Sequence, residues 1–256
     1  MKRIILVCLC LILACATIVA QDRKVQNRPY TDLRPFHFGI HVGTHMQDME
    51  FINAGPLTTI DEDGNEQTTY FTCDQDRWDP GFNVGVLGEF RLHENFQLRI
   101  APAIYFGSRH IVFHNKNQNE NQNEEGEEGN KNSAERRQDM KTAYVTTSVD
   151  LIFAAPRCNN HRAYMFAGVT PTLNLTGKET DYLRLKPLQT FVEIGFGFDE
   201  YLPFFKCRPE LKFMFGLGNA LDMNHAGKLK DKNMLACANS VTSAHAKMIT
   251  LSFFFE

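Results

Sequence analysis

The residues that most resemble a metal or catalytic site in this chain are two histidines four positions apart, His37 and His41. Their spacing imitates the H-x-x-x-H element of zinc enzymes, but Phe38 stands where H-E-x-x-H has its glutamate. The surrounding residues alternate between apolar and polar, which predicts a β-strand. Positions four apart on a strand lie roughly 13 Å from each other, too far to share one metal ion. We therefore expect neither a metal nor a cofactor here.

Other enzymatic motifs are also missing from the sequence. There is no G-x-S-x-G nucleophile motif, and the glycines at Gly195 and Gly197 do not continue into G-x-G-x-x-G before a helix. A formal charge of -3 with 22% charged residues gives no indication of a nucleic-acid partner. We expect a protein that is not an enzyme and binds no small-molecule substrate, while an active site built at one rim from residues distant in sequence stays open as an alternative.

The clearest structural signal comes from two alternating segments, 82–92 and 96–107. Apolar residues such as Phe82 occupy every second position, and polar or small residues such as Asn83 fill the positions between them. Because successive side chains of a strand point to opposite faces, each segment is predicted to be a strand with one apolar and one polar face. Only residues 93–95 separate them, which predicts a tight antiparallel hairpin.

The same alternation recurs along the chain and predicts eight strands, whose connections alternate between long and short. The predicted strands are 36–51, 82–92, 96–113, 140–154, 163–176, 191–202, 208–221 and the segment after residue 242. The long connections are 52–80, 114–139, 177–190 and 222–242. Outer-membrane barrels have an even number of strands, short periplasmic turns and longer external loops. We therefore predict an all-β fold, an eight-stranded antiparallel transmembrane β-barrel with four long external loops. A soluble, lipocalin-like barrel is the alternative.

A barrel of this size is just wide enough inside for its own side chains to fill it. The polar faces of the strands place charges of both signs inside, and such charges must pair because isolated buried charges are very costly. The predicted polar network of the lumen consists of Glu89, Arg91, Arg99, Asp150, Glu193, Glu210 and Lys212. We interpret it as a packed plug, with an ion path as the alternative.

The N-terminus predicts export. Lys2 and Arg3 precede a short apolar run and small residues up to Ala20, as in a signal peptide, and Cys15 leaves a lipoprotein as the alternative. No stretch has the roughly 20 apolar residues of a membrane-spanning helix. The predicted organisation is a signal peptide at 1–20, a periplasmic segment at 21–35 and an outer-membrane barrel at 36–256. Within the barrel, the Asn- and Glu-rich segment 114–139 is predicted to be a disordered external loop.

Four cysteines remain after the leader, and the topology sorts them by membrane side. Cys73 and Cys237 fall in long external loops, whereas Cys158 and Cys207 fall at short periplasmic turns. A disulfide needs Cα atoms within about 7 Å, so a bond across the membrane is excluded. If disulfides form, they join Cys73 to Cys237 and Cys158 to Cys207; four free thiols are the alternative.

Three segments carry a resemblance to a known family. The residues RPFHFGIHVGTHMQDMEF at 34–51, DPGFNVGVLGEFRLHENFQLRIAP at 79–102 and FVEIGFGFDEYLPFFK at 191–206 resemble the PorT family of outer-membrane β-barrel proteins of Bacteroidetes. The resemblance implies a component of the type IX secretion system, required for export of proteins with a C-terminal secretion signal, secreted cysteine proteases among them, and in many relatives for gliding. It implies no catalytic residues. The implied partners are outer-membrane lipid and other secretion components, including the large outer-membrane translocon.

A second hypothesis stands beside this one. A stand-alone small outer-membrane protein would use its long external loops for adhesion or ligand binding. The first hypothesis predicts co-purification with other secretion components in mild detergent, and the second predicts an isolated monomer.

Overall fold

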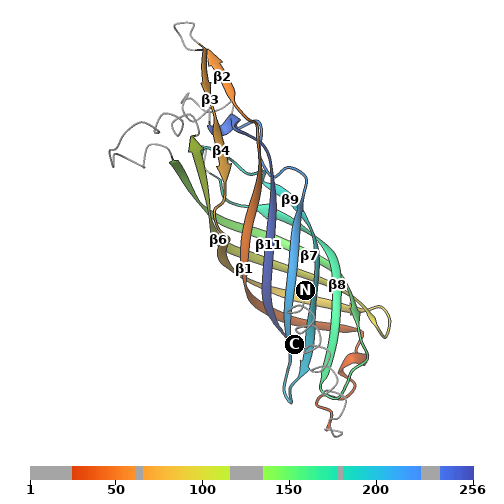
Figure 1. Ribbon diagram of the computed structural model, residues 1–256. Coiled ribbons are helices and arrows are strands. Elements are labelled where there is room, and N and C mark those ends of the chain that lie inside the picture. The colour runs from red at the N-terminus through yellow and green to blue at the C-terminus, as the bar shows by residue number, and fades with distance from the viewer. Residues whose placement is uncertain (1–24, 61–65, 116–134, 178–180, 226–236) are drawn as a thin grey trace, which may run out of the picture.

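The computed structural model describes residues 25–60, 66–115, 135–177, 181–225 and 237–256, and eight long strands within them close into an antiparallel barrel (Figure 1). The barrel strands are β1 (Phe36–Asn53), β5 (Asp79–Arg91), β6 (Phe96–Asn115), β7 (Glu135–Ala154), β8 (His161–Asn174), β9 (Leu188–Tyr201), β10 (Lys206–Leu217) and β11 (Val241–Phe255). Each strand pairs with the next one, and β11 pairs with β1 to close the ring. The predicted eight-stranded barrel is confirmed. The predicted signal peptide at 1–20 lies outside the described residues.

The barrel wall is apolar outside, and inward-facing positions along its strands carry polar and charged side chains. On β9, Ile194 and Phe196 point outward and are 56% and 48% exposed, whereas the adjacent Glu193 points inward and is fully buried. The same alternation runs through β1, where Phe38 and Ile40 face outward and His41 faces inward. A soluble barrel has the opposite arrangement, so the outer wall of this one is suited to lipid. No helix among the described residues is long and apolar enough to cross a membrane.

The strands β6 and β7 extend further than the sequence predicted. They pair without interruption from Phe96 and Phe153 at one end to His114 and Glu135 at the other. The first and last residues of the segment 114–139, which was predicted to be disordered, therefore belong to β6 and β7. The backbone hydrogen bonds between the two strands continue there although few of the residues are apolar. Residues 116–134, the rest of that segment, lie outside the described residues, and their disorder stays a prediction.

The first long connection, predicted as a loop at 52–80, contains three further strands. The strands β2 (Leu57–Ile60) and β3 (Glu66–Thr69) form a separate hairpin that rises above the barrel in Figure 1. The strand β4 (Phe71–Asp74) then pairs with the external end of β6 and buries Phe71 and Cys73. This pairing satisfies the backbone groups that β6 would otherwise expose beyond the barrel ring.

Glycines on β9 make room for two aromatic side chains in the lumen. A Cβ atom at Gly197 would lie 2.4 Å from the hydroxyl oxygen of Tyr164, and one at Gly195 would lie 2.3 Å from the ring of Phe166. Both distances are far below normal contact. The lumen is thus filled by side chains packed onto bare backbone, as expected for a narrow barrel.

Candidate functional site

The most distinctive part of the interior is a network of buried ion pairs in the half of the lumen nearer the periplasmic turns. Arg99 on β6 lies at its centre, with Nη2 3.0 Å from Oδ2 of Asp150 and Nη1 2.6 Å from Oε2 of Glu210. The hydroxyl of Tyr164 donates a third hydrogen bond, 3.0 Å long, to Glu210. The three charged side chains are completely buried. Because each charge is paired, the network is a packed part of the fold.

A second arginine, Arg208 on β10, lies closer to the periplasmic turns. Its Nη1 is 2.6 Å from Glu89 Oε2 and 2.6 Å from Glu256 Oε1, and its Nε is 2.7 Å from Asp199 Oδ1. Lys206 adds a further ion pair to Glu256. Arg208 also lies over the ring of Tyr164, with 4.6 Å from guanidinium carbon to ring centroid, so the two arginine centres are in contact through one side chain.

A third group extends the network towards the outside. The Nζ of Lys212 lies 3.1 Å from Glu193 Oε1 and donates to the hydroxyl of Ser148 at 3.2 Å. The hydroxyl of Thr170 hydrogen-bonds to the other oxygen of Glu193. Strands β6 to β10 all contribute charged or polar side chains, so the network crosses the barrel from wall to wall.

Six of the seven residues predicted for the lumen meet in this network. They are Glu89, Arg99, Asp150, Glu193, Glu210 and Lys212. The prediction for Arg91 is wrong: its side chain is half-buried at the periplasmic rim, where Nη1 donates to the carbonyl of Leu33 at 3.3 Å. Arg91 has the correct parity, but it is the last residue of β5 and lies where the barrel ends.

Four charged members of the network were missed. They are Asp199, Lys206, Arg208 and Glu256. The strand alternation already indicated two of them. Arg208 lies two positions before Glu210, and Asp199 lies six positions after Glu193, so each faces the same side of its strand as a residue that was predicted to face the lumen. Lys206 was assigned to a turn, but it is the first residue of β10.

The two histidines of the sequence motif also face the lumen. His37 Nδ1 lies 3.5 Å from Glu256, and the ring of His41 stacks on Phe254 with 4.6 Å between centroids. They contact different groups, as their separation along a strand requires. Within the described part of the chain, no three His, Cys, Asp or Glu side chains are arranged to hold a metal ion.

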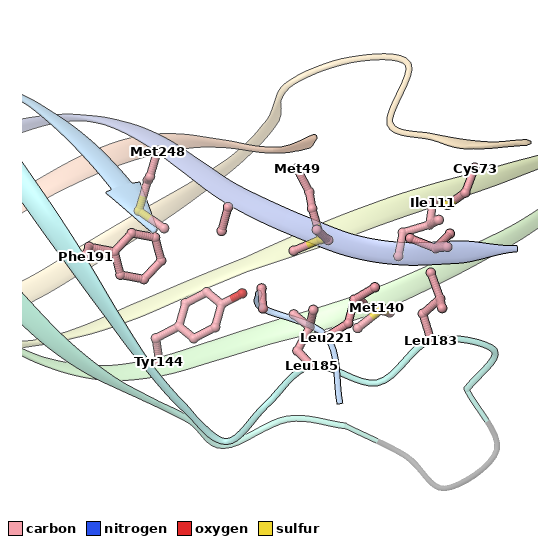
Figure 2. Close-up of a cluster of buried hydrophobic side chains, with 14 of the residues drawn as sticks. Met49, Cys73, Ile111, Met140, Tyr144, Leu183, Leu185, Phe191, Leu221 and Met248 are labelled. Carbon is pink, nitrogen blue, oxygen red and sulfur yellow. The ribbon is translucent and has the colours of Figure 1, made fainter. Parts of the chain in front are cut away.

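The external half of the lumen contains a cluster of buried apolar side chains, which we call the external cluster (Figure 2). The members labelled in Figure 2 are Met49, Cys73, Ile111, Met140, Tyr144, Leu183, Leu185, Phe191, Leu221 and Met248. Leu183, Leu185 and Leu221 come from connections between strands and point inward towards Met140 and Tyr144. Leu183 and Leu185 lie in the connection predicted at 177–190, whereas Leu221 lies at the end of the strand predicted at 208–221, and strand alternation did not predict that these residues pack together. The lumen is therefore closed twice, by ion pairs and by an apolar core.

The cysteines gather at the two ends that the topology assigned to them, and all four are free thiols. Cys73 and Cys237 are both buried in the external cluster, whereas Cys158 is exposed at the opposite end. Cys207 is half-buried and lies opposite Glu200 in the ladder of β10 and β9. Glu200 in turn lies opposite His161 of β8, and His161 forms a β-bridge with Cys158, so both cysteines are at the same end of the barrel. The alternative of four free thiols describes this structure.

We expect these thiols to differ sharply in reactivity. Burial raises the pKa of Cys73 and of Cys237, and the thiolate is the reactive form, so neither should react with a maleimide before unfolding. Cys158 should react in the folded protein. Labelling of single-cysteine variants with a membrane-impermeant maleimide measures this, and Cys158 should label only after the outer membrane is permeabilised. Labelling of Cys158 on intact cells would reverse the assigned topology.

The N-terminal segment crosses the periplasmic mouth of the barrel. It contains the short 3-10 helix η2 (Thr31–Leu33), and Asp32 of this helix accepts a 2.5 Å hydrogen bond from the hydroxyl of Tyr201. The same carboxylate lies 3.8 Å from Arg157 and 3.5 Å from Arg162. Arg157 also donates to the carbonyl of Asn27. The segment is thus held by charged hydrogen bonds rather than by an apolar core.

Replacing Asp32 by alanine should release this segment. Hydrogen bonds to a charged group contribute about 1.5–3 kcal/mol, and partial exposure of Asp32 puts the effect near the lower figure, roughly tenfold in the opening equilibrium. Limited chymotrypsin digestion of the folded protein should then cleave after Tyr30 or Leu33 about tenfold faster. Asp139→Ala at the other end of the barrel is the control. Equal digestion of both variants would show that Asp32 does not hold the segment.

These features define a class of protein: a small transmembrane β-barrel with a lipid-facing wall and a filled lumen. The chain belongs to the outer membrane protein beta-barrel domain family, whose match covers residues 19–222. The protein is located in the outer membrane, as the sequence analysis predicted.

Solved structures of other outer-membrane barrels are similar to this chain. Neisserial surface protein A is 8% identical, covering 86% of this chain and 98% of its own, with a TM-score of 0.39. Ail of Yersinia pestis, in complex with the heparin analogue sucrose octasulfate, is 11% identical. The match covers 87% of this chain and 99% of Ail, with a TM-score of 0.37. OprG of Pseudomonas aeruginosa is 11% identical. The match covers 85% of this chain and 92% of OprG, with a TM-score of 0.44. No curated protein matches the chain.

Proposed function

We propose that this barrel is a non-enzymatic component of the type IX secretion system that acts through contacts with partner proteins. In this role it is required for export of proteins that carry a C-terminal secretion signal. The proposal starts from the resemblance of residues 34–51, 79–102 and 191–206 to the PorT family. These segments form most of β1, β5 and β9 and the start of β6, and they supply five charges of the lumen network, namely Glu89, Arg99, Glu193, Asp199 and Lys206.

The single observation that supports a role through contacts is the complete burial of the charges in the lumen. Arg99, Arg208 and their carboxylate partners are at most 3% exposed. A polypeptide passing through the barrel would have to separate these ion pairs and the external cluster above them, and exposing buried ion pairs singly is strongly unfavourable. Cargo therefore takes another route, and this protein contributes its outer wall, rims and loops.

Deletion of the gene tests the secretion role. We expect a cargo protein with the C-terminal signal to accumulate unprocessed in the periplasm, and export to return when the intact gene is restored. The matched variant is Arg99→Lys, which keeps a positive charge in the lumen and should complement. Normal export by the deletion strain would reject the role.

The second candidate function is adhesion or ligand binding by the external end. The hairpin of β2 and β3 extends beyond the barrel ring, and β4 attaches its base to β6 (Figure 1). A projecting, hydrogen-bonded hairpin offers a surface to a partner outside the cell. Purification in mild detergent separates the candidates: secretion components should accompany the protein in the first case, and a monomer should be recovered in the second.

A further inference from the structure

A groove runs along the outer wall of the barrel over β8. It is hollowed at Ala163 and Ala167, the small outward-facing residues of this strand, because longer side chains of β7 and β9 lie beside them. Leu151 and Ile194, for example, lie opposite Ala167 on either side. The two parts of the groove have volumes of about 250 and 400 Å³, and Met165 lines both. Their lining is almost entirely apolar, which suits a hydrocarbon ligand.

The length of this wall groove corresponds to one leaflet of a membrane. On β9 its lining runs from Ile194, near the middle of the strand, to Phe198, which lies towards the periplasmic turns. Positions four apart on a strand are roughly 13 Å from each other, and half of a hydrocarbon core about 30 Å thick is about 15 Å. The wall groove therefore has the length that an acyl chain of the periplasmic leaflet requires.

At its periplasmic end the wall groove adjoins a charged pocket of about 250 Å³, which we call the rim pocket. Ala155 lines both of them. The rim pocket lies between the turn that joins β5 to β6, the turn that joins β7 to β8, and the N-terminal segment. The two turns are held together, because Asn95 Nδ2 donates a 2.8 Å hydrogen bond to the carbonyl of Ala154. The apolar groove thus ends at a polar opening on the side where the lipid headgroups of one leaflet begin.

The rim pocket carries one surplus positive charge. Its charged lining residues are Arg91, Arg157, Arg162, Asp32 and Glu94. Asp32 is 3.8 Å from Arg157 and 3.5 Å from Arg162. Within the described part of the chain Arg91 forms no ion pair, and its guanidinium makes one hydrogen bond, to the carbonyl of Leu33 at 3.3 Å. Arg91 can therefore bind an anionic group, and arginine forms strong hydrogen bonds with phosphate oxygens.

We propose that one anionic phospholipid binds at this site, with its phosphate at Arg91 in the rim pocket and one acyl chain in the wall groove. The single negative charge of a phosphodiester matches the surplus charge of the rim pocket, and the hydrocarbon chain matches the apolar lining. An extended protein segment would leave its backbone groups without partners in such a groove, which is costly within a bilayer. The inference depends on the wall and the rim alone and stands apart from the proposed secretion role.

Native mass spectrometry of the full chain in detergent, titrated with phosphatidylglycerol or phosphatidylcholine, tests the charged half of the site. Both lipids carry a phosphate, but only phosphatidylglycerol has a net negative charge. We expect the wild type to bind one phosphatidylglycerol, and Arg91→Gln to bind it about tenfold more weakly because a charged hydrogen bond is lost. Arg137→Gln, which removes an exposed arginine at the external end, should bind as the wild type does. Equal binding of the two lipids, or of wild type and Arg91→Gln, would overturn the proposal.

A second pair of variants tests the apolar half of the site. Ala167→Phe fills the wider part of the wall groove without changing a charge, and should weaken phosphatidylglycerol binding by about tenfold, the equivalent of about two buried methylene groups. Val42→Phe places the same side chain on the wall at β1, away from the groove, and should have no effect. Both variants keep an apolar residue on a lipid-facing wall, so both should fold. Unchanged binding by Ala167→Phe, or a wild type that binds no phosphatidylglycerol, would reject the site.

Discussion

Replacing Arg99 by methionine is expected to lower the free energy of unfolding by about 3–5 kcal/mol, because it leaves two buried acids without their cation. Arg99 pairs with Asp150 at 3.0 Å and with Glu210 at 2.6 Å, and all three side chains are fully buried. Methionine keeps most of the packing against Phe166 and Phe254, on which the guanidinium lies. The loss therefore reports the charge. Urea unfolding in detergent measures it.

The exposed ion pair between Lys247 and Glu50 supplies the control. Lys247→Met removes the cation of this pair, whose side chains are 37% and 61% exposed. Surface ion pairs contribute about 0–1 kcal/mol, so this variant should unfold almost as the wild type does. Equal destabilisation by Arg99→Met and Lys247→Met would mean that water reaches the lumen network, and it would remove the main support for a sealed barrel.

Strand periodicity was sufficient to predict the fold and most of the lumen network. Glu193 and Ile194 are adjacent, and alternation alone assigned one to the interior and the other to the wall, as the structure has them. Periodicity does not indicate where a barrel ends, however. Arg91 has the inward parity but lies at the rim, while Lys206 has it and was mistaken for part of a turn.

The external cluster shows a different limit of sequence reasoning. Leu183, Leu185 and Leu221 come from connections, in which residues follow no strand period. They are buried because the connections fold back over the external opening and remove apolar surface from water. That packing is decided by segments far apart in the chain, so a window of sequence cannot reveal it. The same holds for β4, which among the described residues pairs with the end of β6 alone.

The second large effect concerns the outer wall. Ile194 lies near the middle of β9, 56% exposed, opposite Ala167 on one side and Phe213 on the other. An arginine at the bilayer midplane of a barrel costs about 2–4 kcal/mol, whereas one near the interface costs about 0–1 kcal/mol. Ile194→Arg should therefore destabilise the protein by the larger amount when it is folded into lipid vesicles. Leu188→Arg, at the external end of the same strand, should cost little.

The comparison of these two variants separates a lipid-facing wall from a wall in water or against protein. In water, both arginines would replace exposed apolar side chains, and each change would stay within about 0.5 kcal/mol, as is usual for surface substitutions. If the wall lay against a protein partner, each arginine would change stability through its local packing, and the cost would not depend on how deep in the bilayer the residue lies. A cost that is large at Ile194 and small at Leu188 in vesicles, measured by urea titration, is the pattern that only a bilayer produces. The loss should shrink when the same variants are folded in detergent, because a micelle deforms around a charge more readily than a bilayer does.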